Sequence, residues 1–183
     1  MSKKGVQNCI RKDIKMNKEN LIKEVEKLAY QFEKEYGGCA QCVIGAIKKC
    51  INGISDDVFK AATGFSGGIG LTGKTCGALI GAVMVISTFI GREYNNFQDP
   101  EKVRFKTYKL TKKLVECFEA EYGSSVCYDI QKKIMDKSFN LWDEKEHRDF
   151  LEAGGHKDKC TAVCGNAAKW AVEFLTEAEL VGE

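Results

Sequence analysis

A glycine-dense segment that runs directly into an apolar stretch constrains the fold of this chain most strongly. Residues 64–81 read GFSGGIGLTGKTCGALIG and contain seven glycines. Such density is typical of a loop that needs positive φ angles or close approach of two backbones. Thr75 is a favourable N-cap residue, so we predict a helix from Thr75 to about Arg92, with Cys76 in its first turn. The segment therefore predicts a glycine-rich loop that leads into a central apolar helix.

The position of Cys76 in the first turn predicts a reactive thiol. Unpaired backbone N–H groups and the helix dipole favour negative charge at a helix N-terminus, which lowers the pKa of a thiol there. The thiolate is the form of cysteine that attacks electrophiles and binds metals. We therefore take Cys76 as the candidate reactive residue. The loop residues expected to shape the site around a cofactor are Gly67, Gly68, Gly70 and Thr75.

The remainder of the chain predicts an all-α fold. Segments with helical periodicity cover residues 18–36, 39–51, 101–122 and 157–180, and shorter helices are expected near Ser55, Cys127 and Phe150. Asp99 before Pro100 has the arrangement of an N-cap and a first helical residue. We predict a compact single-domain helical bundle of about six helices over residues 17–183. Residues 1–16 are expected to form a disordered tail.

Charge and hydropathy exclude several classes of protein. The 183 residues carry a formal net charge of +2 and have a pI of about 8.0, which gives no electrostatic case for nucleic-acid binding. The longest uncharged run, residues 75–91, contains glycines and is typical of a buried core helix rather than a membrane span. The N-terminal residues lack the apolar core of a signal peptide. We expect a cytoplasmic protein with no nucleic-acid partner and no membrane insertion.

The cysteines carry the strongest functional signal. There are nine, an odd number, so they cannot all pair within one chain. In a cytoplasmic chain, this many thiols favour metal binding or redox chemistry over structural disulfides. Four of them lie near predicted helix N-termini: Cys39, Cys76, Cys127 and Cys160. If those helix ends converge, the site would favour thiolates or an anionic cluster, so we predict that these four form a metal or iron–sulfur site.

Further residues are possible additions to this set. Cys42 shares a helix face with Cys39, Cys164 follows Cys160 by four residues, and His156 precedes Cys160 by four. Cys50 lies eleven residues after Cys39, about 16 Å along a helix, which is too far for one mononuclear centre. The cysteines and histidine that we do not expect at the site are Cys50 and Cys117 in the core, Cys9 in the tail, and His147 on a solvated helix surface.

Residues 68–75, GIGLTGKT, also fit the P-loop pattern G-x-x-x-x-G-K-[ST]. In a P-loop, Lys74 would bind phosphate and Thr75 would bind magnesium. A P-loop follows a buried β-strand, whereas the preceding DDVFKAATGF is typical of a capped helix. The chain also shows no alternating βα pattern. Nucleotide hydrolysis is therefore disfavoured.

Several motifs resemble the C-GCAxxG-C-C family of redox-active proteins. CGALIG at residues 76–81 matches the central CGAxxG motif, and the preceding GFSGGIG resembles the glycine loop of the family. Gly38-Cys39-Ala40-Gln41 resembles the first cysteine motif, and Cys127 and Cys160 match the later single cysteines. The similarity spans about residues 28–175. The resemblance implies a small helical protein whose cysteines take part in redox chemistry or bind a metal.

Two features depart from the pattern of that family. Lys74 stands where an acidic residue is expected, and Cys42 and Cys164 are extra thiols. They raise the question whether this chain uses the usual ligand set or an expanded one.

The leading functional prediction is a redox protein with two possible mechanisms. The four thiolates bind an iron–sulfur cluster or another metal and pass single electrons, or they cycle between dithiol and disulfide with Cys76 attacking. Four thiols complete a tetrahedral or cluster site, which favours the first mechanism. The alternative is a non-enzymatic protein that stores, senses or traffics a soft metal, so enzyme activity stays open. The expected partners are a redox protein and a second copy of the chain. The small-residue face around Gly77 and Gly81 lets another helix pack closely, either within the monomer or across such a dimer.

Overall fold

The computed structural model describes residues 17–181, and these confirm the all-α fold. They form eight α-helices rather than about six: α1 (Lys18–Tyr36), α2 (Cys39–Cys50), α3 (Asp56–Ala61), α4 (Gly77–Ile90), α5 (Val103–Tyr122), α6 (Cys127–Met135), α7 (Glu144–Glu152) and α8 (Cys160–Glu177). Short 3-10 turns η1 (Ala62–Phe65) and η2 (Tyr94–Asn96) and a π-helical turn η3 (Gly155–Lys159) join some of them. The predicted tail, residues 1–16 with Cys9, lies outside the described residues, and the predicted domain limits stay a prediction.

Side-chain caps explain where three helices begin. The Asn17 side chain accepts a hydrogen bond from the backbone N–H of Asn20 at 2.8 Å, so α1 starts at the predicted residue. Ser55 caps α3 in the same way, and Asp143 accepts from the N–H of Glu146 at 2.9 Å to start α7. Satisfying these N–H groups fixes the helix starts, and it matters most for α3 and α7, which bury no residue and only Phe150, respectively.

The predicted starts of α5 and α8 are wrong by a few residues. Helix α5 begins at Val103 because Asp99 has a φ of 54° and its carboxylate reaches forward to accept from the N–H groups of Val103 and Arg104. Pro100 is therefore not the first helical residue. Helix α8 begins at Cys160 rather than near residue 157, because Gly154, with a φ of 92°, opens the π-helical turn η3 before it.

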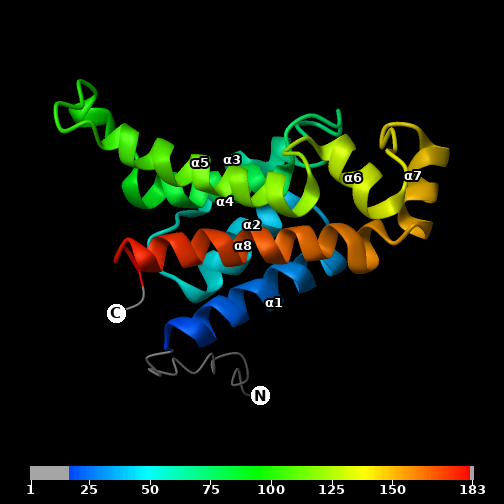
Figure 1. Ribbon diagram of the computed structural model, residues 1–183, viewed down its shortest axis with the longest axis horizontal. Coiled ribbons are helices and arrows are strands. Elements are labelled where there is room, and N and C mark those ends of the chain that lie inside the picture. Colours follow the sequence, from blue (N-terminus) through cyan, green and yellow to red (C-terminus); the bar gives the residue numbers. More distant parts are fainter. Residues whose placement is uncertain (1–16, 182–183) are drawn as a thin grey trace, which may run out of the picture.

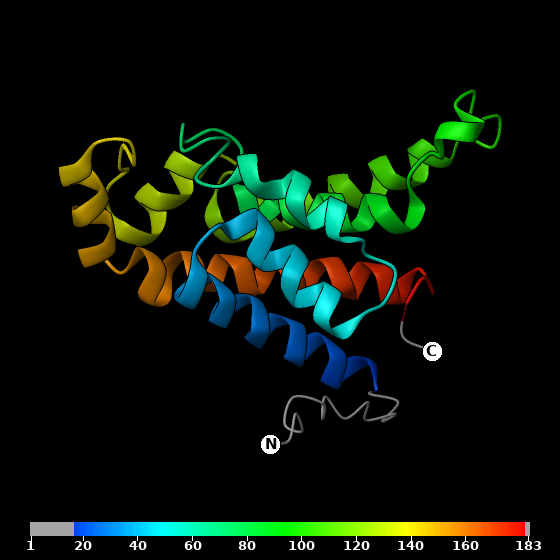
Figure 2. The same cartoon turned by 180° about the vertical axis from the view of Figure 1, so that it is seen from behind.

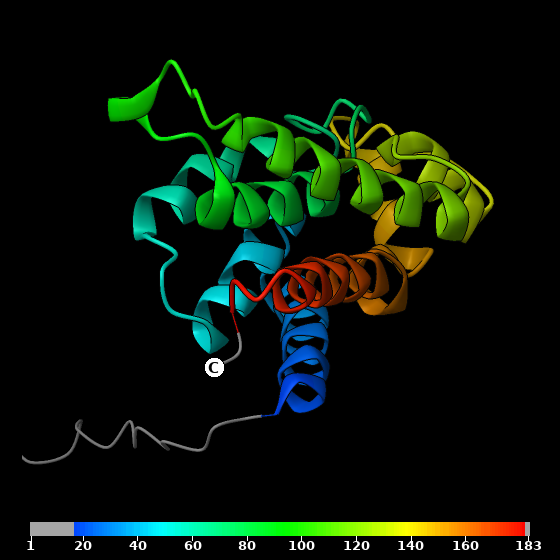
Figure 3. The ribbon, with the colours of Figure 1, turned by 60° about the vertical axis from the view of Figure 1, so that its left-hand side comes forward.

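The helices pack around one apolar core. Figure 1 shows α1 and α8 side by side, with α4 and α5 on the other side of α8. Figure 2, from behind, shows α2 beside α1 and α4, and Figure 3 shows the segment between α4 and α5 projecting from the body. No helix within residues 17–181 is long and apolar enough to cross a membrane. Fully buried core side chains include Val25, Ile44, Ile47, Val85, Ile86, Phe118 and Leu175.

The small-residue face of α4 packs inside the chain. A Cβ atom added at Gly81 would lie 2.5 Å from the carbonyl oxygen of Ala40 in α2, so the two backbones touch there. Gly77, Ala78 and Ala82 on the same helix are also buried. A homodimer would therefore need a surface other than this face.

Candidate functional site: a cavity lined by thiols

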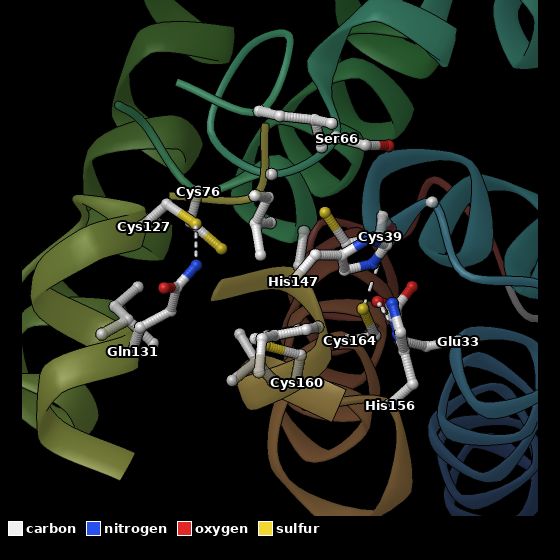
Figure 4. Close-up of a pocket in the computed structure, with 18 residues that line it drawn as sticks. Glu33, Cys39, Ser66, Cys76, Cys127, Gln131, His147, His156, Cys160 and Cys164 are labelled. Carbon is white, nitrogen blue, oxygen red and sulfur yellow. Dashed lines mark hydrogen bonds and ion pairs between the residues drawn. The ribbon is translucent and has the colours of Figure 1, made fainter. Parts of the chain in front are cut away.

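A cavity of about 170 Å³ lies at the end of the bundle where α6, α7 and the glycine-rich loop meet the first turns of α2, α4 and α8. Its walls include all four cysteines of the predicted ligand set, Cys39, Cys76, Cys127 and Cys160, together with Cys164 (Figure 4). The apolar part of the wall consists of Leu71, Ala78, Ile130, Leu141, Phe150 and Val163. Side chains that are far apart in the sequence thus share one space.

Backbone pairing holds Cys76 and Cys127 beside each other. Thr75 and Val126 form an isolated antiparallel bridge; around it the N–H of Cys76 donates to Ser125 at 2.9 Å and the N–H of Cys127 donates to Lys74 at 2.6 Å. In this register the two cysteines are diagonal neighbours on one face, a relation that corresponds to about 7–8 Å. A single bridge has no periodic sequence signal, so the sequence did not predict it.

The glycine-rich loop makes this pairing possible. A Cβ atom at Gly68 would lie 2.5 Å from the backbone nitrogen of Lys74 and 2.8 Å from Cβ of Cys127, and one at Gly73 would lie 2.3 Å from the ring of Tyr128. Both glycines have a positive φ, as the sequence predicted for the loop. The loop can therefore fold tightly against the start of α6.

The other loop residues have different positions. Gly67 lies in the cavity wall, and a Cβ atom there would lie 2.5 Å from Cδ2 of Leu71, so glycine leaves room for that side chain. The carbonyl of Gly70 accepts a hydrogen bond from Nε1 of Trp142 at 2.9 Å. Thr75 is exposed and is not the N-cap of α4, because Cys76 itself takes that place and the helix begins at Gly77. The prediction for Thr75 as the cap is thus wrong.

The sulfur of Cys39 lies against the N-terminal end of α4. A Cβ atom at Gly77 would lie 2.5 Å from this sulfur and 2.6 Å from the carbonyl oxygen of Phe65. Cys39 is the first residue of α2, and Cys164 of α8 donates its S–H to the Cys39 carbonyl at 3.8 Å. The starts of α2 and α4 therefore meet at one thiol, beside α8.

Burial raises the pKa of every thiol at the site. For Cys76 the pKa rises to about 12, mainly through burial and then through the charge of Cys127, and the N–H groups of Leu79 and Ala78 offset this only in part. The predicted lowering of the Cys76 pKa is therefore wrong. Burial and the charge of Cys39 also raise the pKa of Cys127 to about 12, although the Gln131 amide donates to its sulfur at 3.4 Å. The free thiols are protonated near neutral pH.

A buried carboxylate beside the thiols escaped the sequence interpretation. Glu33 lies in the last turn of α1 with a side chain that is only 3% exposed, and its Oε1 pairs with Nδ1 of His156 at 3.1 Å. The other oxygen, Oε2, is buried without a hydrogen-bond partner. A signal was available, because Glu33 follows Val25 and Ala29 at intervals of four along the buried stripe of α1.

The remaining candidates divide between the cavity and the body of the protein. His156, which was predicted as an additional ligand, lines the cavity and lies beside Glu33. His147 is exposed, as predicted, but it also lines the edge of the cavity. Cys42 is buried beside Glu33 and donates its S–H to the carbonyl of Gly37 at 3.0 Å. Cys50 and Cys117 are partly buried and lie outside the cavity, Cys50 against the core.

The thiols are not preassembled around a single ion. Within residues 17–181, no three His, Cys, Asp or Glu side chains are arranged so that they could hold a metal ion, and all eight described cysteines are free. Coordination of one centre would therefore require at least rotation of the cysteine side chains about χ1. The P-loop alternative finds no support, because α3 and η1 rather than a strand precede the loop and Lys74 is exposed.

Comparison with known families confirms the resemblance seen in the motifs. The family model described as "Putative redox-active protein (C_GCAxxG_C_C)" matches residues 38–174, which is well over half of the chain. Comparisons with curated proteins and with solved structures each found no match. The matched range includes every cysteine of the cavity, whereas Glu33 lies before it. The chain therefore belongs to the C_GCAxxG_C_C family of redox-active proteins.

Proposed function

We propose that the cavity binds an iron–sulfur cluster or another metal through the thiolates of Cys39, Cys76, Cys127 and Cys160, and that the protein transfers electrons through this centre to a redox partner protein. The observation that carries the proposal is the convergence of these four side chains on one cavity. Thiolates are soft ligands that favour copper(I), zinc and iron–sulfur clusters. The donor set therefore suits such a group.

The size and the walls of the cavity support the same proposal. Its volume of about 170 Å³ is similar to that of an engineered cavity of ~150 Å³ that admits benzene, so it has room for a group of several atoms. Apolar side chains such as Ile130 and Phe150 form part of the wall. Exclusion of water by such a wall is one of the means by which proteins tune the reduction potential of a metal centre.

Thiol–disulfide cycling receives less support. A low pKa would be needed for Cys76 to attack a disulfide at neutral pH, but burial raises that pKa to about 12. A metal cation removes this obstacle, because a coordinating thiol loses its proton.

Anaerobic purification followed by metal and sulfide analysis tests this function. We expect a stoichiometric metal, with acid-labile sulfide and visible absorbance if the group is an iron–sulfur cluster. The Cys76→Ser variant should lose most of the bound species while it keeps its helical circular dichroism. The Cys117→Ser variant is the matched control, because Cys117 lies outside the cavity. Wild-type protein that contains neither metal nor cluster would contradict the proposal.

Soft-metal storage or trafficking is the second candidate, and Glu33 favours it. The negative charge of this buried carboxylate opposes an anionic cluster and favours a cation. Rapid transfer of the bound metal to a chelator, without a measurable redox couple, would identify this function instead of electron transfer.

A further inference from the structure

Glu33 belongs to the thiol cavity rather than to the surface of α1. Its side chain lines the cavity and is only 3% exposed. Figure 4 shows Glu33 and His156 on the same side of the cavity as Cys39 and Cys164, away from Cys127 and Gln131. A carboxylate in this position is surrounded by thiols and apolar groups instead of water. Its burial is costly unless hydrogen-bond donors or a cation compensate for the lost hydration.

One oxygen of the Glu33 carboxylate has no hydrogen-bond partner. Oε1 lies 3.1 Å from Nδ1 of His156, an ion-pair distance at which that nitrogen makes no hydrogen bond, while Oε2 is buried and accepts no hydrogen bond. Cys42 lies next to Glu33: after burial, the charge of the Glu33 carboxylate and hydrogen bonding to it raise the pKa of this thiol, while its S–H donates to the carbonyl of Gly37 at 3.0 Å. Buried polar atoms are rarely left unpaired, and an ionised carboxylate has room for several donors or for a cation. The Oε2 atom is therefore available to a group that enters the cavity.

The charge of Glu33 reaches the whole cluster of thiols. It contributes to the raised pKa of Cys76, Cys127 and the four further thiols around it, Cys39, Cys42, Cys160 and Cys164. A negative group inside a set of thiols disfavours additional anions. A divalent cation would remove this repulsion, because it interacts favourably with both the carboxylate and the thiolates.

We propose that Glu33 is an oxygen ligand at this cavity, which together with Cys39 and Cys164 binds a divalent metal cation of the zinc or iron(II) kind. The proposal rests on the metal-binding function proposed above and names a ligand that lies before the range matched by the family. His156 lies beside the carboxylate, with Nδ1 3.1 Å from Oε1, where a side chain that pairs with a metal-binding carboxylate would lie.

The metal would hold a mixed set of donors. Zinc accepts thiolate at about 2.3 Å and carboxylate at about 2.0–2.2 Å, so both kinds of donor fit one tetrahedral ion. Binding releases the thiol protons to solvent and changes no oxidation state. Because the metal-free side chains are not in coordinating geometry, χ1 rotation of the two cysteines accompanies binding.

Metal titrations of the full chain, reduced and freed of metal, test this assignment. We use zinc(II) in competition with a chelator for affinity and cobalt(II) for the ligand set. Glu33→Gln keeps the shape of the side chain and removes its charge; the matched control is Glu35→Gln, which changes an exposed residue of the same helix. We expect Glu33→Gln to raise the zinc dissociation constant at least tenfold and to shift the cobalt d–d bands, with thiolate-to-cobalt charge transfer retained.

The outcomes separate this inference from the proposed function. Glu33→Asp, which restores a carboxylate, should recover part of the affinity, whereas Glu35→Gln should bind like the wild type. If Glu33→Gln binds zinc and cobalt unchanged while Cys76→Ser does not bind, Glu33 is not a ligand, although the metal site itself stands. If the wild type binds neither ion, both proposals are wrong. Circular dichroism melting of Glu33→Gln verifies that the variant is folded.

Discussion

The sulfur of Cys39 lies where the side chain of any residue other than glycine at position 77 would have to go. We predict that Gly77→Ala reduces metal loading, because its Cβ would be 2.5 Å from that sulfur and 2.6 Å from the Phe65 carbonyl oxygen. The backbone oxygen cannot turn away as a flexible side chain would, so we expect a loss of stability of about 1–3 kcal/mol. Denaturant unfolding and metal analysis measure the two effects.

Gly64→Ala is the control for this variant. Nothing lies within 4 Å of a Cβ atom at Gly64, and that residue has no positive φ. Its stability should stay within about 0.5 kcal/mol of the wild type. Equal behaviour of the two variants would contradict the role assigned to Gly77.

At the scale of single residues, the sequence identified the cysteines but not their environment. Cys39, Cys76, Cys127 and Cys160 were predicted from their spacing and motifs, and they do line one cavity. The pKa of Cys76 was predicted in the wrong direction, because a helix N-terminus is a local feature whereas burial depends on the complete fold. Glu33 was missed although its spacing from Val25 and Ala29 places it on the buried stripe of α1.

Among the elements, the short pairing of the glycine-rich loop with the start of α6 brings two cysteines together. We predict that Gly73→Ala weakens this pairing, because the ring of Tyr128 lies 2.3 Å from the position of its Cβ. The variant should unfold at a lower temperature. Its cavity thiols should also react faster with a thiol reagent, because the backbone hydrogen bonds that hold Cys76 and Cys127 in place are weakened.

Gly70→Ala separates backbone strain from steric conflict. Gly70 also has a positive φ, 59°, but nothing lies within 4 Å of its Cβ position. It should therefore show only the strain, about 1–2 kcal/mol, and Gly73→Ala should lose more. Identical losses would mean that the contact with Tyr128 is unimportant.

The helices themselves were predictable where the sequence contains caps and long periodic segments. The start of α1 at Asn17 and the short helix after Ser55 were predicted correctly. The π-helical turn before Cys160 and the bridge between Thr75 and Val126 were not, because each involves few residues and depends on contacts with distant segments.

For the whole molecule, the raised pKa values predict that the metal-free protein loses stability in alkaline solution. The unfolded chain releases thiol protons near the ordinary pKa of 9.0, whereas folded Cys76 and Cys127 keep them up to about pH 12. Between these values the unfolded state binds fewer protons, so the free energy of unfolding falls as pH rises. This contribution is fully present below pH 9 and lost as pH passes the folded pKa values.

Denaturant unfolding between pH 8 and 10.5 checks this expectation. Above pH 9 each thiol should contribute a slope that approaches about 1.4 kcal/mol per pH unit, so Cys76→Ser should unfold with a shallower dependence than the wild type. Cys117→Ser, at a thiol outside the cavity, should change the slope less. Indistinguishable slopes for wild type and Cys76→Ser would contradict the burial of this thiol.

The cysteines that meet at the cavity are spread along the chain from the start of α2 to the first turns of α8. A ribosome must therefore finish nearly the entire polypeptide before the last of these sulfurs has been made. Insertion of the proposed metal or cluster is then necessarily a late step in biogenesis, and a fragment that stops before α8 would lack a complete set of donors.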